Sequence, residues 1–246
     1  AICGGCTAAG TLGAVADGIG DPLNVFEERL QTLKSKGFKA IVGLKPRRQQ
    51  DIIERMKIAA NAGVVAFTID LDSAGRAARA TKGQTVEPKT PEQLRELVKA
   101  SPLPLFFKGI LTTDEALLCL NAGAAGIVVS NHGGRVLADE PGTAEVLPAI
   151  ADAIHGRCMI LVDGCVKRGT DVEKYIALGA DACLAGRHFV RGAHGALADG
   201  VELFANTIRN ELAVAMTLTG AAKVKDINRK MIRMTTPPPL AFGVPA

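Results

Sequence analysis

Short apolar runs alternate with longer amphipathic segments along almost the whole chain, and this alternation limits the fold more than any other feature. Each run is short and bounded by polar residues or glycine, which is typical of a strand buried on both faces. Strands separated by single helices pair in parallel through right-handed crossovers. The predicted strands are residues 11–16, 40–44, 64–69, 103–107, 125–129, 159–162 and 182–185, and the predicted helices are 23–36, 48–62, 112–122, 143–155 and 189–219, with two more opening at Thr90 and Gly169.

Strand–helix units of this kind predict an α/β protein of the (β/α)8 TIM-barrel class, with polar residues gathered after the strands at one face. A doubly wound sheet is the alternative, but it usually shows a glycine fingerprint after its first strand, and none is evident. Residues 2–9 resemble the tail of a helix, so we expect the first strand of the barrel to be absent from this sequence. We predict one N-terminally incomplete domain over residues 1–246, with a polar loop at 73–89 and an irregular, proline-rich tail at 235–246.

Charge and aromatic content argue against nucleic acid as a partner. The chain has 29 basic and 25 acidic residues, a net charge of +4, and no long basic run. It has one tyrosine and no tryptophan, so it offers little for stacking on bases. The small positive excess suits an anionic small molecule.

The cysteines favour a reduced, cytoplasmic protein. Several of the six lie in apolar patterns, where a free thiol behaves as a small hydrophobic residue. Cys3 and Cys6 have a spacing that metal or redox sites use, but no second pair or nearby histidine completes such a site. We therefore expect no bound metal, and no signal peptide or membrane-length apolar segment is evident.

The segment Ser130-Asn131-His132-Gly133-Gly134-Arg135 ends the apolar run 125–129 and carries the clearest chemistry. His132 supplies a base, and Arg135 supplies a planar clamp for a carboxylate or phosphate. The two glycines allow a tight turn or close approach to a ligand. The alternative is an ordinary glycine turn with a surface histidine.

Other strand ends add charged side chains that we expect to converge on the same face. Lys108 follows an apolar run and suits an anion or an electron-rich ring. Asp70 is a candidate partner for His132, with its neighbour Asp72 ranked lower, although a turn or capping aspartate is equally compatible with the pattern. Lys45 ends another strand and is placed to reach the same mouth.

The last two strands are followed by basic loops that predict a phosphate site. Asp163-Gly164-Cys165-Val166-Lys167 follows one strand, and Gly186-Arg187 follows the next. Loops at these places in barrels bind phosphate through backbone N–H groups, a helix N-terminus and basic side chains. Lys167 and Arg187 are the natural phosphate partners.

Over residues 64–232 the chain resembles the FMN-dependent α-hydroxy-acid dehydrogenase/oxidase family, the group that contains glycolate oxidase and lactate oxidase. The Ser130–Arg135 hexapeptide is highly specific to that family. The other segments that carry the resemblance are Phe107-Lys108-Gly109-Ile110-Leu111-Thr112, Leu161-Val162-Asp163-Gly164, Arg168-Gly169-Thr170-Asp171-Val172 and Ala177-Leu178-Gly179-Ala180-Asp181-Ala182.

The resemblance implies a role for each matched residue. It makes His132 the active-site base, Arg135 the clamp on the substrate carboxylate, and Asp70 the support of protonated His132. It places FMN at one mouth of the barrel, next to residues from several strand ends. The implied FMN contacts are Thr68 at the flavin ring, Lys108 near the flavin N1/C2 carbonyl, Asp163 at the ribityl chain, and Gly164, Cys165, Lys167, Gly186 and Arg187 towards the phosphate.

The sequence departs from the family pattern at several of these positions. Family members usually carry glycine where Cys165 stands and arginine where Lys167 stands. The two tyrosines that commonly touch substrate have no counterpart, and Lys45 occupies one of those positions. Glycolate or lactate is therefore not assumed as the substrate.

These features together predict an enzyme that uses FMN to oxidise a small 2-hydroxy acid to the 2-oxo acid. Two alternatives stay open: an FMN barrel with another reaction, such as an isomerase or a glutamate-synthase-like protein, and a degenerate barrel without catalysis. The resemblance also implies a homo-oligomer, a tetramer or larger. Neither nucleic acid nor a membrane is an expected partner.

Overall fold

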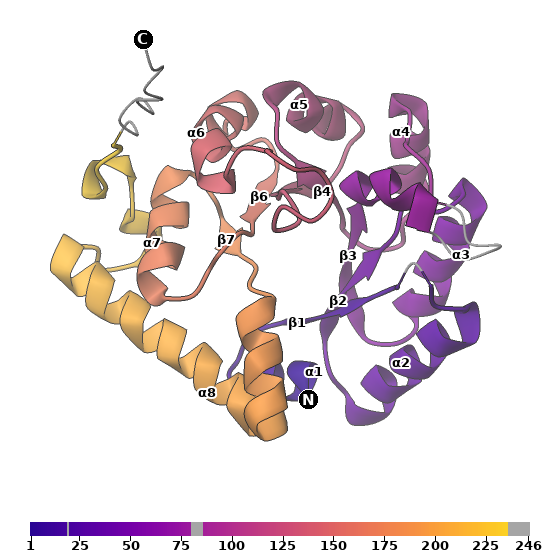
Figure 1. The fold of residues 1–246 in the computed structure, drawn as a ribbon, viewed down its shortest axis with the longest axis horizontal. Coiled ribbons are helices and arrows are strands. Elements are labelled where there is room, and N and C mark those ends of the chain that lie inside the picture. Colours follow the sequence, from indigo (N-terminus) through magenta and orange to yellow (C-terminus); the bar gives the residue numbers. More distant parts are fainter. Residues whose placement is uncertain (19, 80–85, 236–246) are drawn as a thin grey trace, which may run out of the picture.

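The computed structural model describes residues 1–18, 20–79 and 86–235. Its centre is one sheet of seven parallel strands, in which strands consecutive in the sequence are neighbours. Figure 1 shows the strands around the middle of the molecule and the helices outside them. The strands are β1 (Gly13–Ala16), β2 (Ala40–Leu44), β3 (Val64–Asp70), β4 (Leu105–Ile110), β5 (Gly126–Val129), β6 (Met159–Val162) and β7 (Ala182–Cys183).

The helices follow the strands as the alternating pattern predicts. Thr90 and Thr112 each form a capping box that fixes where a helix begins. The helices are α1 (Ile2–Ala8), α2 (Leu23–Lys36), α3 (Gln49–Ala60), α4 (Pro91–Ala100), α5 (Thr113–Asn121), α6 (Thr143–Ile154), α7 (Gly169–Leu178) and α8 (Arg187–Thr219), and the 3-10 helices are η1 (Leu71–Arg79), η2 (Val224–Asp226) and η3 (Arg229–Met231).

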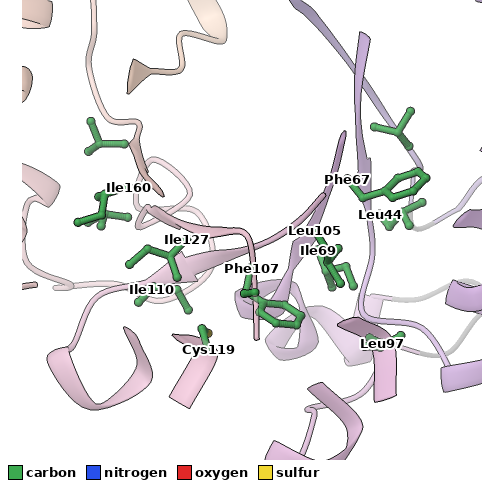
Figure 2. Packing of buried hydrophobic residues seen from close by; sticks show 14 of the residues in the cluster. Leu44, Phe67, Ile69, Leu97, Leu105, Phe107, Ile110, Cys119, Ile127 and Ile160 are labelled. Carbon is green, nitrogen blue, oxygen red and sulfur yellow. The ribbon is translucent and has the colours of Figure 1, made fainter. Parts of the chain in front are cut away.

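The two faces of the sheet pack differently because side chains alternate along each strand. One face packs against the helices and forms the main core; there Phe67 and Phe107 are fully buried (Figure 2). The other face forms a small inner cluster from residues of neighbouring strands that lie on the inside of the sheet. The buried members of this cluster are Ala66, Phe106, Val128 and Leu161, with Ile41, Ala182 and Leu184 packed against them.

This inner cluster determines which residues face the mouth of the barrel. Two positions further along β3 and β4, Thr68 and Lys108 lie on the same side as Ala66 and Phe106. The same step leads from Val128 to Ser130 and from Leu161 to Asp163, immediately after β5 and β6. The apolar layer therefore closes the inside of the sheet below a ring of polar side chains.

The architecture confirms the predicted fold class, a barrel of the (β/α)8 type represented by seven of its strands. β1 and β7 are the outer strands, and no pairing between them occurs in the described part of the chain. Helix α1 packs directly against α8: a Cβ on Gly5 would lie 2.6 Å from Cβ of Val201. The beginning of the chain and its last long helix are thereby side by side.

The structure corrects two details of the sequence-based prediction. The first part of the predicted 73–89 loop is helical, because η1 spans Leu71–Arg79, while residues 80–85 lie outside the described residues. β4 continues to Ile110, so Lys108 is inside the strand rather than beyond it. Of the predicted tail, residues 236–246 lie outside the described residues.

The cysteines are free thiols, and none of the described helices is long and apolar enough to cross a membrane. Burial raises the pKa of Cys119 and of Cys183 to about 12, with a smaller contribution from nearby acidic groups. These two thiols therefore behave as core residues.

We expect Gly169→Ala to destabilise the protein, because the new Cβ would lie 2.0 Å from the backbone nitrogen of Leu212. α7 and α8 would have to separate, which costs about 1–3 kcal/mol or more. The free energy of unfolding in urea measures this cost. Gly142→Ala is the matched control, since no atom lies within 4 Å of a Cβ there; equal effects of the two substitutions would contradict the packing described.

Candidate active site

Four buried or half-buried charged groups meet where β2, β3, β4 and β6 end. The Lys45 ammonium lies 2.5 Å from Oδ2 of Asp70. Lys108, opposite Asp70 in the β3–β4 register, lies 4.0 Å from Oδ1 of Asp70 and 3.4 Å from Oδ2 of Asp163. The two lysines and two aspartates thus form a charge-balanced cluster, which we call the strand-end cluster.

The pKa of Asp70 is set by opposing effects within this cluster. Burial raises this pKa. The opposite effect is larger: the pKa is lowered by the positive charges of Lys45 and Lys108, by the hydrogen bond from Lys45 and by the charge of His132. The net result is a pKa below the usual value for aspartate. Asp70 is therefore ionised at neutral pH and compensates the charge of two buried ammonium groups.

Ser130 connects the strand-end cluster to the histidine segment. Its Oγ accepts a hydrogen bond from Lys108 Nζ at 2.9 Å and another from the backbone N–H of His132 at 3.1 Å. Ser130 is fully buried, so these contacts are shielded from water. Ser130 could be predicted from the sequence only as part of the motif, because a hydroxyl gives no indication of the partner it will bind.

His132 is buried, and its backbone is held in a left-handed conformation. Its φ is 54°, and Gly133 and Gly134 follow with φ values of 69° and 68°. Such a φ is uncommon in residues other than glycine, and strain of this kind concentrates at functional sites. The two glycines therefore form a tight turn, as the motif predicted, in which the N–H of Gly134 donates to the carbonyl of Asn131 at 2.9 Å.

The carboxylate that contacts the imidazole is Asp72 and not Asp70. Nδ1 of His132 lies 2.8 Å from Oδ2 of Asp72. Asp70 is the last residue of β3 and turns to Lys45, whereas Asp72 is in the first turn of η1. Asp70 accepts a hydrogen bond from Lys45 and interacts with His132 through its charge, so its predicted support of protonated His132 stays a prediction, while the lower-ranked Asp72 makes the direct contact.

Two guanidinium groups surround Gly133 on the exposed side of the site. A Cβ on Gly133 would lie 3.4 Å from Nη2 of Arg187 and 4.0 Å from Nε of Arg135. Nε of Arg135 donates to the carbonyl of His132 at 3.0 Å, while the side chain remains exposed. The geometry brings both arginines next to His132, where they can meet an anion.

The predicted phosphate residues lie on the exposed rim near the start of α8. Gly186 is its N-cap, and a Cβ there would have no neighbour within 4 Å. The pKa of His188 is lowered by partial burial and then by the positive charges of Arg191, Lys167 and Arg187, so basic groups are concentrated there. Basic side chains next to a helix N-terminus suit a phosphate.

Hydrogen bonds from side chains of α6 and α7 stabilise the turn that follows β6. The hydroxyl of Thr143 donates to the carbonyl of Asp163 at 2.6 Å, and the Tyr175 hydroxyl donates to the carbonyl of Gly164 at 2.8 Å. Cys165 follows with a φ of 52°, a conformation that glycine adopts more readily. The contributions of Thr143 and Tyr175 were not predicted, because nothing in the sequences of the flanking helices marks these two hydroxyls as partners of the turn.

The remaining predicted residue, Thr68, is buried on the inner face of β3, and its Oγ1 would lie 3.3 Å from a Cβ on Gly43. One oxygen of Asp163 and one of Asp72 are buried without a hydrogen-bond partner in the described part of the chain. Native proteins rarely leave buried acceptors unpaired. These oxygens, the Lys108 ammonium and the basic rim fit a ligand that has hydroxyl groups and a phosphate, as FMN does.

Comparison with known proteins identifies the family. Residues 23–234 match the family described as FMN-dependent dehydrogenase, and the chain belongs to that family. The resemblance stated from the sequence is thereby confirmed.

Named relatives come from the same family. The chain is 42% identical over 154 residues to L-lactate oxidase of Lactobacillus jensenii, which covers 63% of this chain and 37% of the relative. It is 43% identical over 142 residues to the peroxisomal (S)-2-hydroxyacid oxidase GLO3 of Arabidopsis thaliana, covering 58% and 38%. The chain thus spans less than two fifths of the length of these curated relatives.

A crystal structure of mandelate oxidase with 3,3-difluoro-2-hydroxy-3-phenylpropionic acid is similar in fold. It superposes with a TM-score of 0.80 at 30% identity, over 93% of this chain and 71% of that one.

No group of three or more His, Cys, Asp or Glu side chains suited to a metal ion occurs among the described residues.

We expect Asp70→Asn to destabilise the protein by about 3–5 kcal/mol at neutral pH, because two buried ammonium groups lose their carboxylate. The pKa of Asp70 is lowered on folding, so its contribution is complete above the unfolded value, near 3.8, and is lost as pH falls through the folded pKa. Urea unfolding from pH 7 to pH 3 measures both effects.

The gap between wild type and variant should therefore shrink below about pH 4. Asp51→Asn, which breaks an exposed pair with Arg48, is the control and should change stability by less than about 1 kcal/mol. A gap that stays constant across this pH range would contradict the ionised Asp70 described.

Proposed function

We propose that this protein binds FMN at the mouth formed by the strand-end cluster and oxidises a small 2-hydroxy acid to the 2-oxo acid. The observation that carries the proposal is the convergence of Lys108, His132 and Arg135 at one site, through Ser130 and the turn at Gly133. Membership of the FMN-dependent dehydrogenase family and relatives named 2-hydroxyacid and lactate oxidases support it.

The proposed FMN contacts follow the charges of the site. Lys108 would stabilise negative charge on the flavin ring, next to Thr68, and the unpaired oxygen of Asp163 would accept from a ribityl hydroxyl. The turn at Gly164 and Cys165 and the basic rim at Lys167, Gly186 and Arg187 would hold the phosphate. Held by these residues, FMN would supply the two-electron acceptor for the oxidation of the substrate.

The protein residues would orient the substrate and move its proton. Arg135 would bind the substrate carboxylate, because an exposed guanidinium with its Nε fixed offers a fork of donors. His132 would accept a proton from the substrate through Nε2, since Nδ1 is engaged by Asp72. Lys45 would shape the substrate side of the site while paired with Asp70.

We also propose that the protein acts in the cytoplasm as a homo-oligomer, a tetramer or larger, without nucleic acid or membrane as a partner. Six free cysteines support a reducing compartment. The composition, with one tyrosine and no tryptophan, supports the absence of nucleic-acid binding. Size-exclusion chromatography with light scattering tests the oligomeric state.

We expect His132→Ala in the full-length protein to lower kcat by about 10²–10⁴-fold, the range that general base catalysis contributes. FMN affinity should change little. The measurement is anaerobic bleaching of bound flavin by glycolate, L-lactate and mandelate. If the wild type binds FMN but none of a wide panel of 2-hydroxy acids bleaches the bound flavin, the proposed reaction is wrong. If His132→Ala turns over substrate as fast as the wild type, His132 is not the base.

We expect Arg187→Ala to weaken binding of FMN by about 10-fold or more, because a charged hydrogen bond to phosphate contributes about 1.5–3 kcal/mol. Riboflavin, which lacks the phosphate, should bind wild type and variant equally. Fluorescence quenching of the two flavins measures both affinities. Arg209→Ala is the control, because Arg209 donates to the carbonyl of Ala9, which precedes β1, and contacts none of the predicted site residues. An equal loss of affinity for riboflavin would contradict a phosphate role.

A further inference from the structure

The turn that follows β6, at residues 163–166, carries backbone donors that have no acceptor. In the described part of the chain, the N–H groups of Gly164, Cys165 and Val166 make no hydrogen bond. Gly164 and Cys165 have φ values of 115° and 52°. Successive free N–H groups in a turn of this kind form a concave site for an anion. How well they meet an anion depends on the direction in which the turn holds them.

The carbonyl groups of the same turn are bound by two hydroxyls from neighbouring helices. Thr143, the first residue of α6, donates to the carbonyl of Asp163 at 2.6 Å, and Tyr175 of α7 donates to the carbonyl of Gly164 at 2.8 Å. In a planar trans peptide, the C=O and the N–H of the next residue point in opposite directions. Holding these two carbonyls towards the helices therefore directs the N–H groups of Gly164 and Cys165 away from them.

Hydrogen bonding, rather than apolar packing, fixes this conformation. A cavity of about 150 Å³ borders the turn, and its lining includes Gly164, Cys165 and Tyr175. Atoms that border a void lack partners there, so packing on that side does not hold the turn in place. The hydroxyls, in contrast, are in close contact with it: a Cβ on Gly164 would lie 2.5 Å from Oγ1 of Thr143 and 3.2 Å from Oη of Tyr175.

Tyr175 is suited to be a permanent donor to the turn. Its side chain is buried, and its hydroxyl oxygen also lies 2.9 Å from Oγ1 of Thr143. Burial raises the pKa of Tyr175, and the hydrogen bond with Thr143 offsets part of that effect. The phenol is therefore protonated at neutral pH and keeps the hydrogen that it donates to Gly164.

We propose that Tyr175, with Thr143 beside it, is a positioning residue of the cofactor-phosphate site. Its hydroxyl holds the carbonyl of Gly164 towards α7, which leaves the N–H of Cys165 free for an acceptor on the other side of the turn. In the proposed function that acceptor is the phosphate of FMN, so the cofactor part of this inference rests on the proposed function. The hydrogen bond from Tyr175 to the turn does not.

The first test is NMR of the full-length protein without FMN, with ¹³C in the glycine carbonyls and ¹⁵N in the cysteines. Only Gly–Cys peptide units then give a signal, and this sequence has two, Gly5-Cys6 and Gly164-Cys165. Cys165→Ser assigns the second signal. Tyr175→Phe should shift the carbonyl resonance of Gly164, because that carbonyl loses its donor. The carbonyl of Gly5 accepts within α1 and should not shift, so it is an internal control.

The second test compares the binding of FMN with that of riboflavin, which lacks the phosphate. Tyr175→Phe keeps the aromatic ring, and we expect it to raise the Kd of FMN about 3–10-fold, the range for one lost hydrogen bond, with the Kd of riboflavin changed less than about 2-fold. Thr143→Val should also raise the Kd of FMN. Thr207→Val is the control, because it removes a hydroxyl that donates to the carbonyl of Leu203 within α8, and it should bind both flavins as the wild type does.

An unshifted carbonyl resonance of Gly164 in Tyr175→Phe would overturn the proposal. So would an unchanged Kd of FMN in that variant, or an equal loss of affinity for riboflavin. Circular dichroism and urea midpoints that match the wild type exclude a general loss of folding as the cause of weaker binding. If the wild type binds no FMN, the proposed function fails and the cofactor role of Tyr175 fails with it. If the wild type binds FMN and Tyr175→Phe binds it equally well, only this inference fails.

Discussion

The pairing of Lys45 and Lys108 with Asp70 and Asp163 is the interaction on which the rest of the site depends. Parallel strands end at the same edge of a sheet, so polar residues placed there necessarily come together. Charges this deeply buried are tolerated only when they are paired and hydrogen-bonded. Because two ammonium groups and two carboxylates neutralise one another, polar side chains can lie at the mouth of a barrel whose interior is apolar.

The same pairing explains how the site is divided. Because Lys45 engages Asp70, the carboxylate that contacts His132 comes from the next turn of chain, at Asp72. Lys108 is shared between the cluster and Ser130, whose hydroxyl also holds the backbone of His132. Ser130 thus connects the strand-end cluster to the segment that contains His132.

Much of this arrangement could be predicted from the sequence. The apolar runs located all seven strands, and the residues that follow these runs supplied Lys108, His132 and Asp163. This works because strands buried on both faces are continuous apolar runs, and parallel pairing brings their ends to one edge. The choice between Asp70 and Asp72 could not be predicted. It depends on a lysine from another strand and on the close packing of Asp72 against Gly109, which are contacts between segments distant in sequence.

The most direct test of the central claim is a crystal structure of the full-length protein with FMN and a 2-oxo acid. The account predicts the flavin against Thr68, Lys108 and Asp163, with Nε2 of His132 towards the C2 oxygen of the ligand and Arg135 on its carboxylate. Flavin bound elsewhere, or an imidazole of His132 that points away from the ligand, would contradict it.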